Sequence, residues 1–478
     1  MNTRLSSLCC CILAPFFLVC PDCRADKGGL AVETSSVGKS YLSYKGAPLL
    51  AFGPGDEMRI VSGAADAARW VKWQRDNGMN LVRAYPASVP IEAYGAPGLA
   101  PFLKRDGKWD VDAFDDAYFT HLGDVAKMLE ENDVILHLQL WQIVFFKDGE
   151  RRWDINFLNP RNNVNEWTQG FSQGRAYIDA PDGSAARAHQ QRWVRHILDA
   201  LKGRGNVIID VINELGNAMG TLEWAVDVTR WIRAWEAEND WSFIVGVDSE
   251  RHYTPEQFGA QREHFDIIIL NELQRRERGM NIIAAFNMPA VSVRSSDGTN
   301  QWDDYLFAGP DQTGPEHQTR YRTLCYRSIF AGLQSVGAYW KSEVQVADYG
   351  DMEHWPGYAR ALRAFWEILS PHWPSLTPVA AEGRVEKAVT PHVYLLDSPA
   401  FVALYLECGS HTWNNEYATS TLRVACEFSD GEARFFNPRT GTMELMAAEY
   451  DGGAFQLSLP PFTDDAVVLI SRAGAGAF

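Results

Sequence analysis

The sequence predicts a (β/α)8 barrel, or TIM barrel, followed by a small antiparallel β-sandwich. Eight short apolar runs are centred near residues 49, 80, 135, 208, 243, 267, 291 and 337, and each but the last precedes a connection that can hold a helix. From about Ser375 the hydrophobic period changes from helical to alternating, with Gly, Asp and Asn turns between short runs. Strands that alternate with helices form a parallel barrel, whereas short alternating strands form a sandwich.

The length of 478 residues exceeds one ordinary domain. We expect a signal peptide over 1–25, a barrel over 26–374 and a sandwich over 375–478. The leader has Arg4 before an apolar run and ends in Ala25, and the run is too short to span a bilayer. A secreted or periplasmic protein without a membrane span is therefore expected. A lipid-anchored form modified at Cys20 is the weaker alternative, because Val19 stands where a small residue is preferred.

Composition narrows the classes of partner. The net charge of -17 argues against nucleic acid and against an anionic membrane surface, because both select basic patches. The chain has 17 Trp and 17 Tyr, and aromatic faces stack on sugar rings, although many of these residues will be core. No phosphate loop, nucleotide fingerprint or serine nucleophile elbow is present, so no cofactor is expected. Carbohydrate is the favoured partner.

Few cysteines remain once the leader is removed. Cys325, Cys408 and Cys426 are too few for a disulfide scaffold or a cysteine-rich zinc site. Cys408 and Cys426 end two neighbouring strand-like runs, so one bridge between them is an open alternative in an exported protein.

The elements follow from local patterns along the chain. Residues 41–48 predict a hairpin-like lid, and the polar set His137, Gln139 and Trp141 alternates with leucines, so it should face the barrel interior or its mouth. The stretch 147–183 lacks periodicity and predicts a functional loop. Helices are expected at 64–77, 114–131, 185–201, 222–238, 255–262, 317–333 and 355–369. Sandwich strands are expected at 388–396, 401–407, 421–428, 432–436, 443–447, 455–459 and 466–470.

The fourth barrel strand carries the main candidate for chemistry. Residues 206–217, NVIIDVINELGN, form an apolar β-branched run that ends in Asn213 and Glu214. Barrel enzymes keep their catalytic residues at the C-terminal ends of strands, so Glu214 is placed at the mouth. The alternatives are a plain strand with a solvated Glu214 and a role for Asn213 as a strand-end cap.

This order of motifs resembles the retaining (β/α)8 glycoside hydrolases of clan A, in which the Glu of an Asn-Glu pair ending strand four is the general acid/base. The resemblance implies that Glu214 has this role, with Asn213 holding a sugar hydroxyl, Arg83 near the nucleophile and Trp340 under the reacting sugar. The C-terminal stretch 433–470 is similar to the sandwich of apiosidase-like bacterial barrel proteins. Tyr85, at the end of strand two, is also expected to contact the substrate, as are His137, Gln139 and Trp141.

The second carboxylate departs from this pattern. Strand seven should end in a nucleophilic Glu, but the sequence there reads Arg294, Ser295, Ser296, Asp297. Asp297, on a turn with Gly298, and Glu343, ending strand eight, are the candidates for the catalytic partner, with Glu272 as a third. If none is placed correctly, the protein inverts, uses another mechanism or only binds glycans. We therefore expect an exported glycoside hydrolase, with a carbohydrate-binding protein as the alternative.

Basic residues are also expected at the mouth. Arg83, Arg294 and Lys341 lie near the ends of strands two, seven and eight. They either pair with Asp297 and Glu343 or bind the carboxylate of an acidic sugar. No metal site is expected, since His137 has no second ligand at suitable spacing. For Asp56, Glu57 and Asp248, at other strand ends, surface loop charge and a structural cation remain as alternatives.

Overall fold

The computed structural model describes residues 29–54, 58–147, 151–216, 219–248, 255–270, 284–292, 315–338, 356–408 and 414–474. Within them, eight parallel strands form one sheet in the order β4-β13-β12-β11-β10-β9-β8-β5, which is the order of the chain around a barrel. All eight lie where the sequence predicts them. Their bounds are β4 Ala51–Pro54, β5 Leu81–Ala84, β8 Ile135–Gln139, β9 Val207–Asp210, β10 Ile244–Asp248, β11 Ile267–Leu270, β12 Ala290–Ser292 and β13 Ser335–Ala338.

The sheet closes between its first and last strands, β4 and β5. The Asn80 N–H donates to the Phe52 carbonyl at 2.8 Å, and the Phe52 N–H donates to Oδ1 of Asn80 at 2.8 Å. A Cβ at Gly53 would lie 2.1 Å from the Leu81 carbonyl oxygen, so only glycine allows this approach. The predicted (β/α)8 barrel is confirmed.

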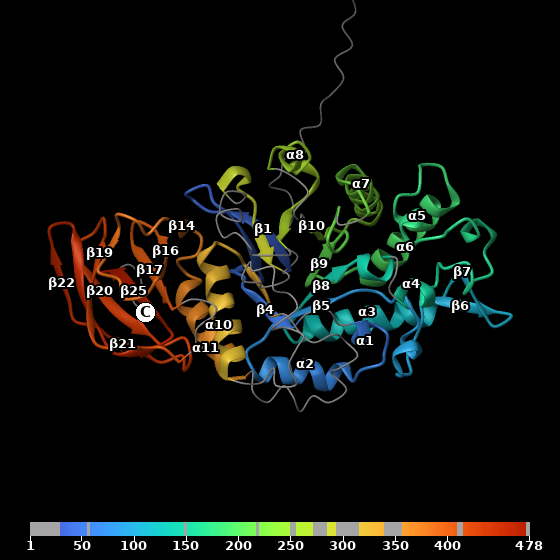
Figure 1. Cartoon of the computed structure of the whole chain (residues 1–478). Helices are drawn as coiled ribbons and strands as arrows, with labels where there is room; N and C mark the ends of the chain where they lie inside the picture. Colours follow the sequence, from blue (N-terminus) through green and yellow to red (C-terminus); the bar gives the residue numbers. More distant parts are fainter. Residues whose placement is uncertain are drawn as a thin grey trace, which may run out of the picture.

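Helices cover the outside of this barrel (Figure 1). Their apolar faces pack on the strands, as α6 does through Trp193, Ile197 and Leu201. Every predicted helix is present, whereas the antiparallel hairpin of β6 (Phe102–Arg105) and β7 (Lys108–Phe114) was not predicted. The main helices are α1 Met58–Val61, α2 Ala67–Asp76, α3 Asp116–Glu131, α6 Ala185–Leu201, α7 Leu222–Asn239, α8 Pro255–Gly259, α10 Pro315–Phe330 and α11 Pro356–Leu369.

The predicted lid over 41–48 is a hairpin at the opposite end from the mouth. Strands β1 (Leu30–Thr34), β2 (Ser40–Tyr44) and β3 (Ala47–Pro48) form a three-stranded antiparallel sheet. The side-chain amide of Gln334, which precedes β13, bonds the Leu42 backbone, and the Leu30 N–H donates to Gly205, which precedes β9. The sheet therefore plugs the N-terminal end of the barrel. An apolar cluster fills this end with Leu42, Leu49, Ala51, Leu81, Ile135, Ile208, Ile244, Ile267, Ile269 and Val291.

The C-terminal strands form the predicted sandwich, which lies beside α10 and α11 (Figure 1). One sheet has the order β14-β16-β17-β25-β20-β21 and the other β15-β19-β23-β22, with a separate apolar core. All seven predicted strands are present. The strands are β14 Thr377–Val379, β15 Val385–Glu386, β16 His392–Asp397, β17 Phe401–Glu407, β18 Glu416–Tyr417, β19 Ser420–Ala425, β20 Gly431–Phe436, β21 Met443–Leu445, β22 Ala448–Asp451, β23 Ala454–Leu459, β24 Phe462–Thr463 and β25 Asp465–Arg472.

The expected alternative of a Cys408–Cys426 bridge is wrong. Among the described residues, neither Cys408 nor Cys426 forms a disulfide, nor does Cys325, and all three are buried. Cys408 follows β17 and Cys426 follows β19, and these strands belong to different sheets of the sandwich, so the two thiols are not cross-strand neighbours. Burial raises the pKa of the Cys426 thiol to about 12, which keeps it a protonated, weakly reactive group.

Among the residues that the structure describes, no helix has the length and apolar character needed to cross a membrane. The expected signal peptide lies outside the described residues.

Candidate active site

The C-terminal end of β9 places Asn213 and Glu214 at the barrel mouth. The Asn213 N–H donates to the Trp141 carbonyl at 3.0 Å, which continues the pairing of β9 with β8. Glu214 then takes a left-handed backbone conformation, with φ of 56°. For a residue other than glycine, this conformation needs support from its surroundings.

Asp248 supplies that support. This residue ends β10, and its Oδ2 accepts the Glu214 backbone N–H at 2.9 Å. Asp248 is fully buried, so the expectation of a surface loop charge is wrong. The Asp248 carboxylate fixes the turn that orients Glu214. It is not a solvated group at the end of the fifth barrel strand, β10.

A buried polar network lies under Asn213. Oδ1 of Asn213 accepts from Nη2 of Arg83 at 2.6 Å and from Nε2 of Gln139 at 3.2 Å. Gln139 also donates to Oδ2 of Asp210 at 3.0 Å, and Nε2 of His137 lies 3.3 Å from the same oxygen. Because an ionised carboxylate only accepts, Nε2 carries the proton in this contact.

The network determines how the Asn213 amide is oriented. With Oδ1 held by two donors, the amide nitrogen Nδ2 must point the other way. Nδ2 is buried and has no hydrogen-bond partner among the described residues. A buried amide without a partner costs free energy, so a ligand or ordered water is expected to accept its proton.

Lys147 is a residue of this site that the sequence did not single out. Its Nζ lies 3.2 Å from Oε2 of Glu214, and the two side chains are 26% and 8% exposed. It follows the short turn η3 (Ile143–Phe145), whose Phe145 packs on Tyr85 with ring centroids 5.6 Å apart. A lone lysine after an apolar run gives no signal of this pairing, because the contact depends on how the connection folds back.

The predicted aromatic contacts Tyr85 and Trp141 are both buried in the wall of the site. Tyr85 lies against Phe145, and Trp141 packs on Trp224 with ring centroids 5.2 Å apart. His137 and Gln139 lie in the layer beneath Asn213, as the alternation along β8 predicts. The leucines of that strand, Leu136 and Leu138, pack in the outer core.

The connection over 151–184 is built from short helices and side-chain hydrogen bonds. Asn156 donates to the Phe145 carbonyl at 2.9 Å, and Asn163 donates to the Phe157 and Asn159 carbonyls at 3.0 and 2.9 Å. These asparagines replace the backbone bonds that a regular element would supply. They organise the connection that begins shortly after Lys147 and ends at α6.

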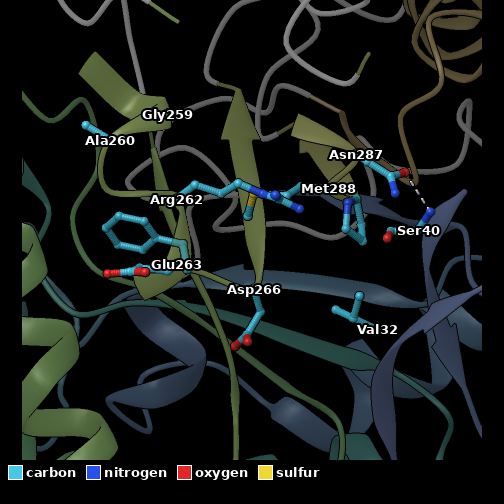
Figure 2. Close-up of a pocket in the computed structure, with 11 residues that line it drawn as sticks. Val32, Ser40, Gly259, Ala260, Arg262, Glu263, Asp266, Asn287 and Met288 are labelled. Atoms are coloured by element: carbon cyan, nitrogen blue, oxygen red, sulfur yellow. Dashed lines mark hydrogen bonds between the residues drawn. The ribbon is translucent and has the colours of Figure 1, made fainter. Parts of the chain in front are cut away.

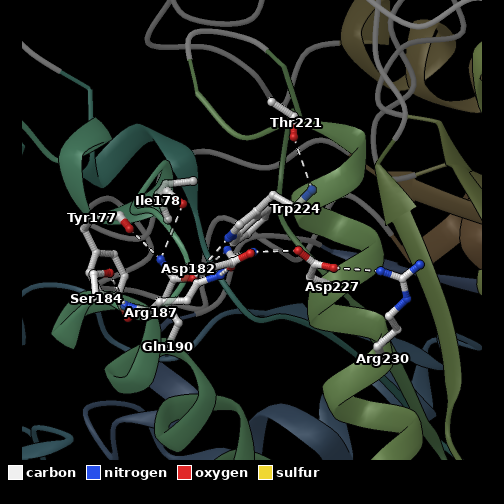
Figure 3. Close-up of polar contacts among 10 residues, drawn as sticks. All are labelled: Tyr177, Ile178, Asp182, Ser184, Arg187, Gln190, Thr221, Trp224, Asp227 and Arg230. Carbon is white, nitrogen blue, oxygen red and sulfur yellow. Dashed lines mark hydrogen bonds and ion pairs between the residues drawn. The ribbon is translucent and has the colours of Figure 1, made fainter.

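Figure 3 shows how this connection is fixed to the helices behind it. Arg187, in α6, donates to Asp182 at 3.1 Å and to Asp227 of α7 at 2.8 Å. Its Nη1 also lies 3.3 Å from Oε1 of Gln190, which accepts from the Trp224 indole at 3.0 Å. The Arg187 guanidinium thus links the connection to α6 and α7, and we assign it a structural role.

Several predicted site residues lie outside the described residues. These are Asp297, Glu343, Arg294, Trp340, Lys341, Glu272, Asp56 and Glu57. The strands that lead to the first five, β12 and β13, both run toward the mouth because the sheet is parallel. Their proposed roles stay predictions.

Among the described residues, hollows lie away from Glu214. One of about 510 Å³ lies beside the N-terminal ends of β11 and β12, where Phe265, Met288 and Val32 line it (Figure 2). Another of about 900 Å³ is open, and Asp112 and Trp167 are among the residues that line it. The described residues contain no cluster of three or more His, Cys, Asp or Glu side chains that could hold a metal ion.

Solved structures share this architecture across both parts of the chain. One described as a glycoside hydrolase superposes with a TM-score of 0.62 at 11% identity, and covers 94% of this chain and 98% of its own. A glycoside hydrolase family 5 protein from Bacteroides vulgatus gives a TM-score of 0.59 at 12% identity, and covers 93% and 94%. No protein-family model and no curated protein sequence matches the chain. At these identities the likeness establishes a shared fold.

Proposed function

We propose that the protein is an exported glycoside hydrolase in which Glu214 is the general acid/base. The observation that carries this proposal is the position of Glu214, a buried residue at the C-terminal end of the fourth of eight barrel strands. The shared fold with glycoside hydrolase structures supports it. In this proposal residues 26–374 are the catalytic unit and 375–478 an appended sandwich.

Hydrolysis of an acetal needs a proton at the leaving oxygen and an anion beside the oxocarbenium-like centre. Glu214 supplies the proton in our proposal, and the Nδ2 group of Asn213 donates to a hydroxyl of the bound sugar. Arg83 holds Asn213 in that orientation. Asp297 or Glu343 supplies the second carboxylate, with Glu272 as the third candidate.

The test is the variant Glu214→Gln, which preserves shape but cannot donate a proton. We expect hydrolysis of substrates with poor leaving groups to fall by about 10² to 10⁴. Aryl glycosides with good leaving groups need less proton transfer and should lose less. Steady-state kinetics on a panel of both kinds of substrate measures the difference.

A matched control is Glu236→Gln, the same change at a buried glutamate of α7 that pairs with Arg233. It should keep the parent's kinetics at temperatures where it is folded. Unchanged turnover of poor-leaving-group substrates by Glu214→Gln would remove Glu214 from its role. Binding of oligosaccharides without hydrolysis by the parent would instead favour the alternative, a carbohydrate-binding protein.

A further inference from the structure

The strongest unexplained contact in the site is an ammonium beside the proposed proton donor. Nζ of Lys147 lies 3.2 Å from Oε2 of Glu214, and the carboxylate is almost wholly removed from solvent. An opposite charge at this range favours the ionised form of a carboxyl group. A general acid, however, must carry its proton when the substrate binds. The contact therefore opposes the first chemical step.

The lysine is held in this place by its surroundings. Phe145 packs on Tyr85, and Phe146 stacks on Tyr177 with ring centroids 6.0 Å apart. The amide of Asn156 bonds the Phe145 carbonyl at 2.9 Å. The backbone just before Lys147 is thus anchored on both sides, so the ammonium is delivered to Glu214 by an ordered connection.

Charged groups on several barrel strands lie near Glu214. Asp248 of β10 accepts its backbone N–H, Arg83 of β5 approaches through Asn213, and Asp210 of β9 lies deeper beside His137. Lys147 places its ammonium within ion-pair distance of the buried Glu214 carboxylate, so it stabilises the ionised form of Glu214.

Resting on the function proposed above, we propose that Lys147 is a positioning residue that holds Glu214 as a carboxylate between turnovers and releases it when Glu214 takes up a proton. Glu214 takes up its proton from hydronium in the solvent, which leaves water, and the ion pair is then replaced by a neutral acid beside a solvated ammonium. As Glu214 gives this proton to the leaving oxygen, the bond from that oxygen to the anomeric carbon breaks and the carbon bonds to the second carboxylate or to water. The Glu214 carboxylate then pairs again with Lys147. The lysine thereby sets the pH at which the site is loaded with its proton.

The first test follows Glu214 directly and needs no substrate. Protein labelled with [δ-¹³C]glutamate is titrated by NMR, and the Glu214 resonance is identified by its absence in Glu214→Gln. In Lys147→Met, we expect Glu214 to bind its proton at least about tenfold more tightly, so its titration moves up by about one pH unit or more. Lys147→Arg keeps a cation and should titrate as the parent does.

The second test is the pH dependence of kcat/KM. The limb on which activity falls as pH rises should move upward in Lys147→Met by the same amount as the titration, and should stay in place in Lys147→Arg. Lys72→Met, which removes an exposed lysine paired with Asp76 on α2, is the matched control and should leave the profile unchanged.

If Lys147 only anchored the loop, Lys147→Met would change the thermal stability but not the titration of Glu214. Identical Glu214 titrations in the parent and Lys147→Met would overturn the proposal. A shifted titration in a protein that hydrolyses no glycoside would uphold the ion pair and reject the proposed function, so the two failures are distinguishable.

Discussion

Among the described residues, the barrel mouth and the junction of barrel and sandwich both contain buried charges. At the junction, Arg322 of α10 donates to both oxygens of Asp465 in β25, and Tyr405 donates to the same carboxylate at 3.0 Å. Arg327 likewise forms a bidentate ion pair with Glu407 of β17. At the mouth, Arg83 meets a neutral amide, and Nδ2 of Asn213 has no partner among the described residues.

The hydrogen bonding of the two regions differs although both contain buried charges, so burial of charge does not by itself mark a functional site. Burial alone would lower the pKa of Arg322, but the charge and hydrogen bonds of Asp465 raise it overall. This carboxylate accepts donors on both oxygens and offers little to a ligand. At the mouth, unused hydrogen-bonding capacity remains on Asn213 and on Oδ1 of Asp210. The Asp465 carboxylate is saturated and holds the fold together, whereas the unsatisfied amide of Asn213 lies at the barrel mouth, where a ligand is expected.

Breaking a saturated pair should have the largest effect on stability. Arg322→Met leaves Asp465 buried without its cation, so we expect the free energy of unfolding to fall by about 3 to 5 kcal/mol. Denaturant unfolding measures this loss, and kcat/KM of the folded variant should stay at the parent's value.

The double variant Arg322→Met, Asp465→Asn is the matched control for that pair. It removes both charges and should recover part of the loss. A fall of less than about 1 kcal/mol in the single variant would show that solvent reaches the junction and that the pair resembles a surface ion pair.

His189 is a buried group that is expected to be neutral in the folded protein. His189 of α6 lies between the Tyr177 hydroxyl and the Val111 carbonyl, each at 2.9 Å, so both ring nitrogens are satisfied. Burial lowers its pKa from 6.5 to about 4, although the Val111 carbonyl opposes this change. Between these pH values the unfolded chain binds the proton and the folded protein does not, so stability is present above pH 6.5 and is lost as pH falls toward 4.

The size of this loss should be about 3 kcal/mol by pH 4, since a tenfold difference in proton affinity between the folded and unfolded states corresponds to about 1.4 kcal/mol. His189→Gln can keep a donor and an acceptor without titrating, so its stability should fall less over this range. His264→Gln, a change in the turn η5 (Arg262–His264), is the control and should follow the parent. Parallel curves for parent and His189→Gln, from urea unfolding at several pH values, would contradict the expected neutral histidine.

Local sequence patterns predicted the fold because they are repeated along the whole chain. The β-branched run before Asn213 identified the fourth strand, and the change of period near Ser375 identified the sandwich. The same patterns failed where a contact depends on two distant segments. Lys147 meets Glu214 because the connection after β8 folds back, and the buried Asp248 of β10 accepts the backbone N–H of Glu214, which follows a different strand, β9. The Cys408–Cys426 alternative failed for the same reason, since spacing along the chain does not show which sheet a strand joins.

Two variants at the mouth have the smallest expected loss of stability. Together they test whether Asn213 only supports the fold or also contacts the ligand. Asn213→Ala removes both hydrogen bonds at Oδ1 of Asn213 and Gln139→Ala removes one of them, so both variants should lower the free energy of unfolding by about 1 to 3 kcal/mol. Only Asn213→Ala also removes the Nδ2 donor. If that group binds a sugar hydroxyl, kcat/KM of the folded protein should fall about tenfold in Asn213→Ala, which equals about 1.4 kcal/mol of lost binding in the transition state. Gln139→Ala should change it much less. Equal kinetic losses in the two variants would mean that Asn213 acts as a strand-end cap, and the mouth would then resemble the junction more closely than its unsaturated groups suggest.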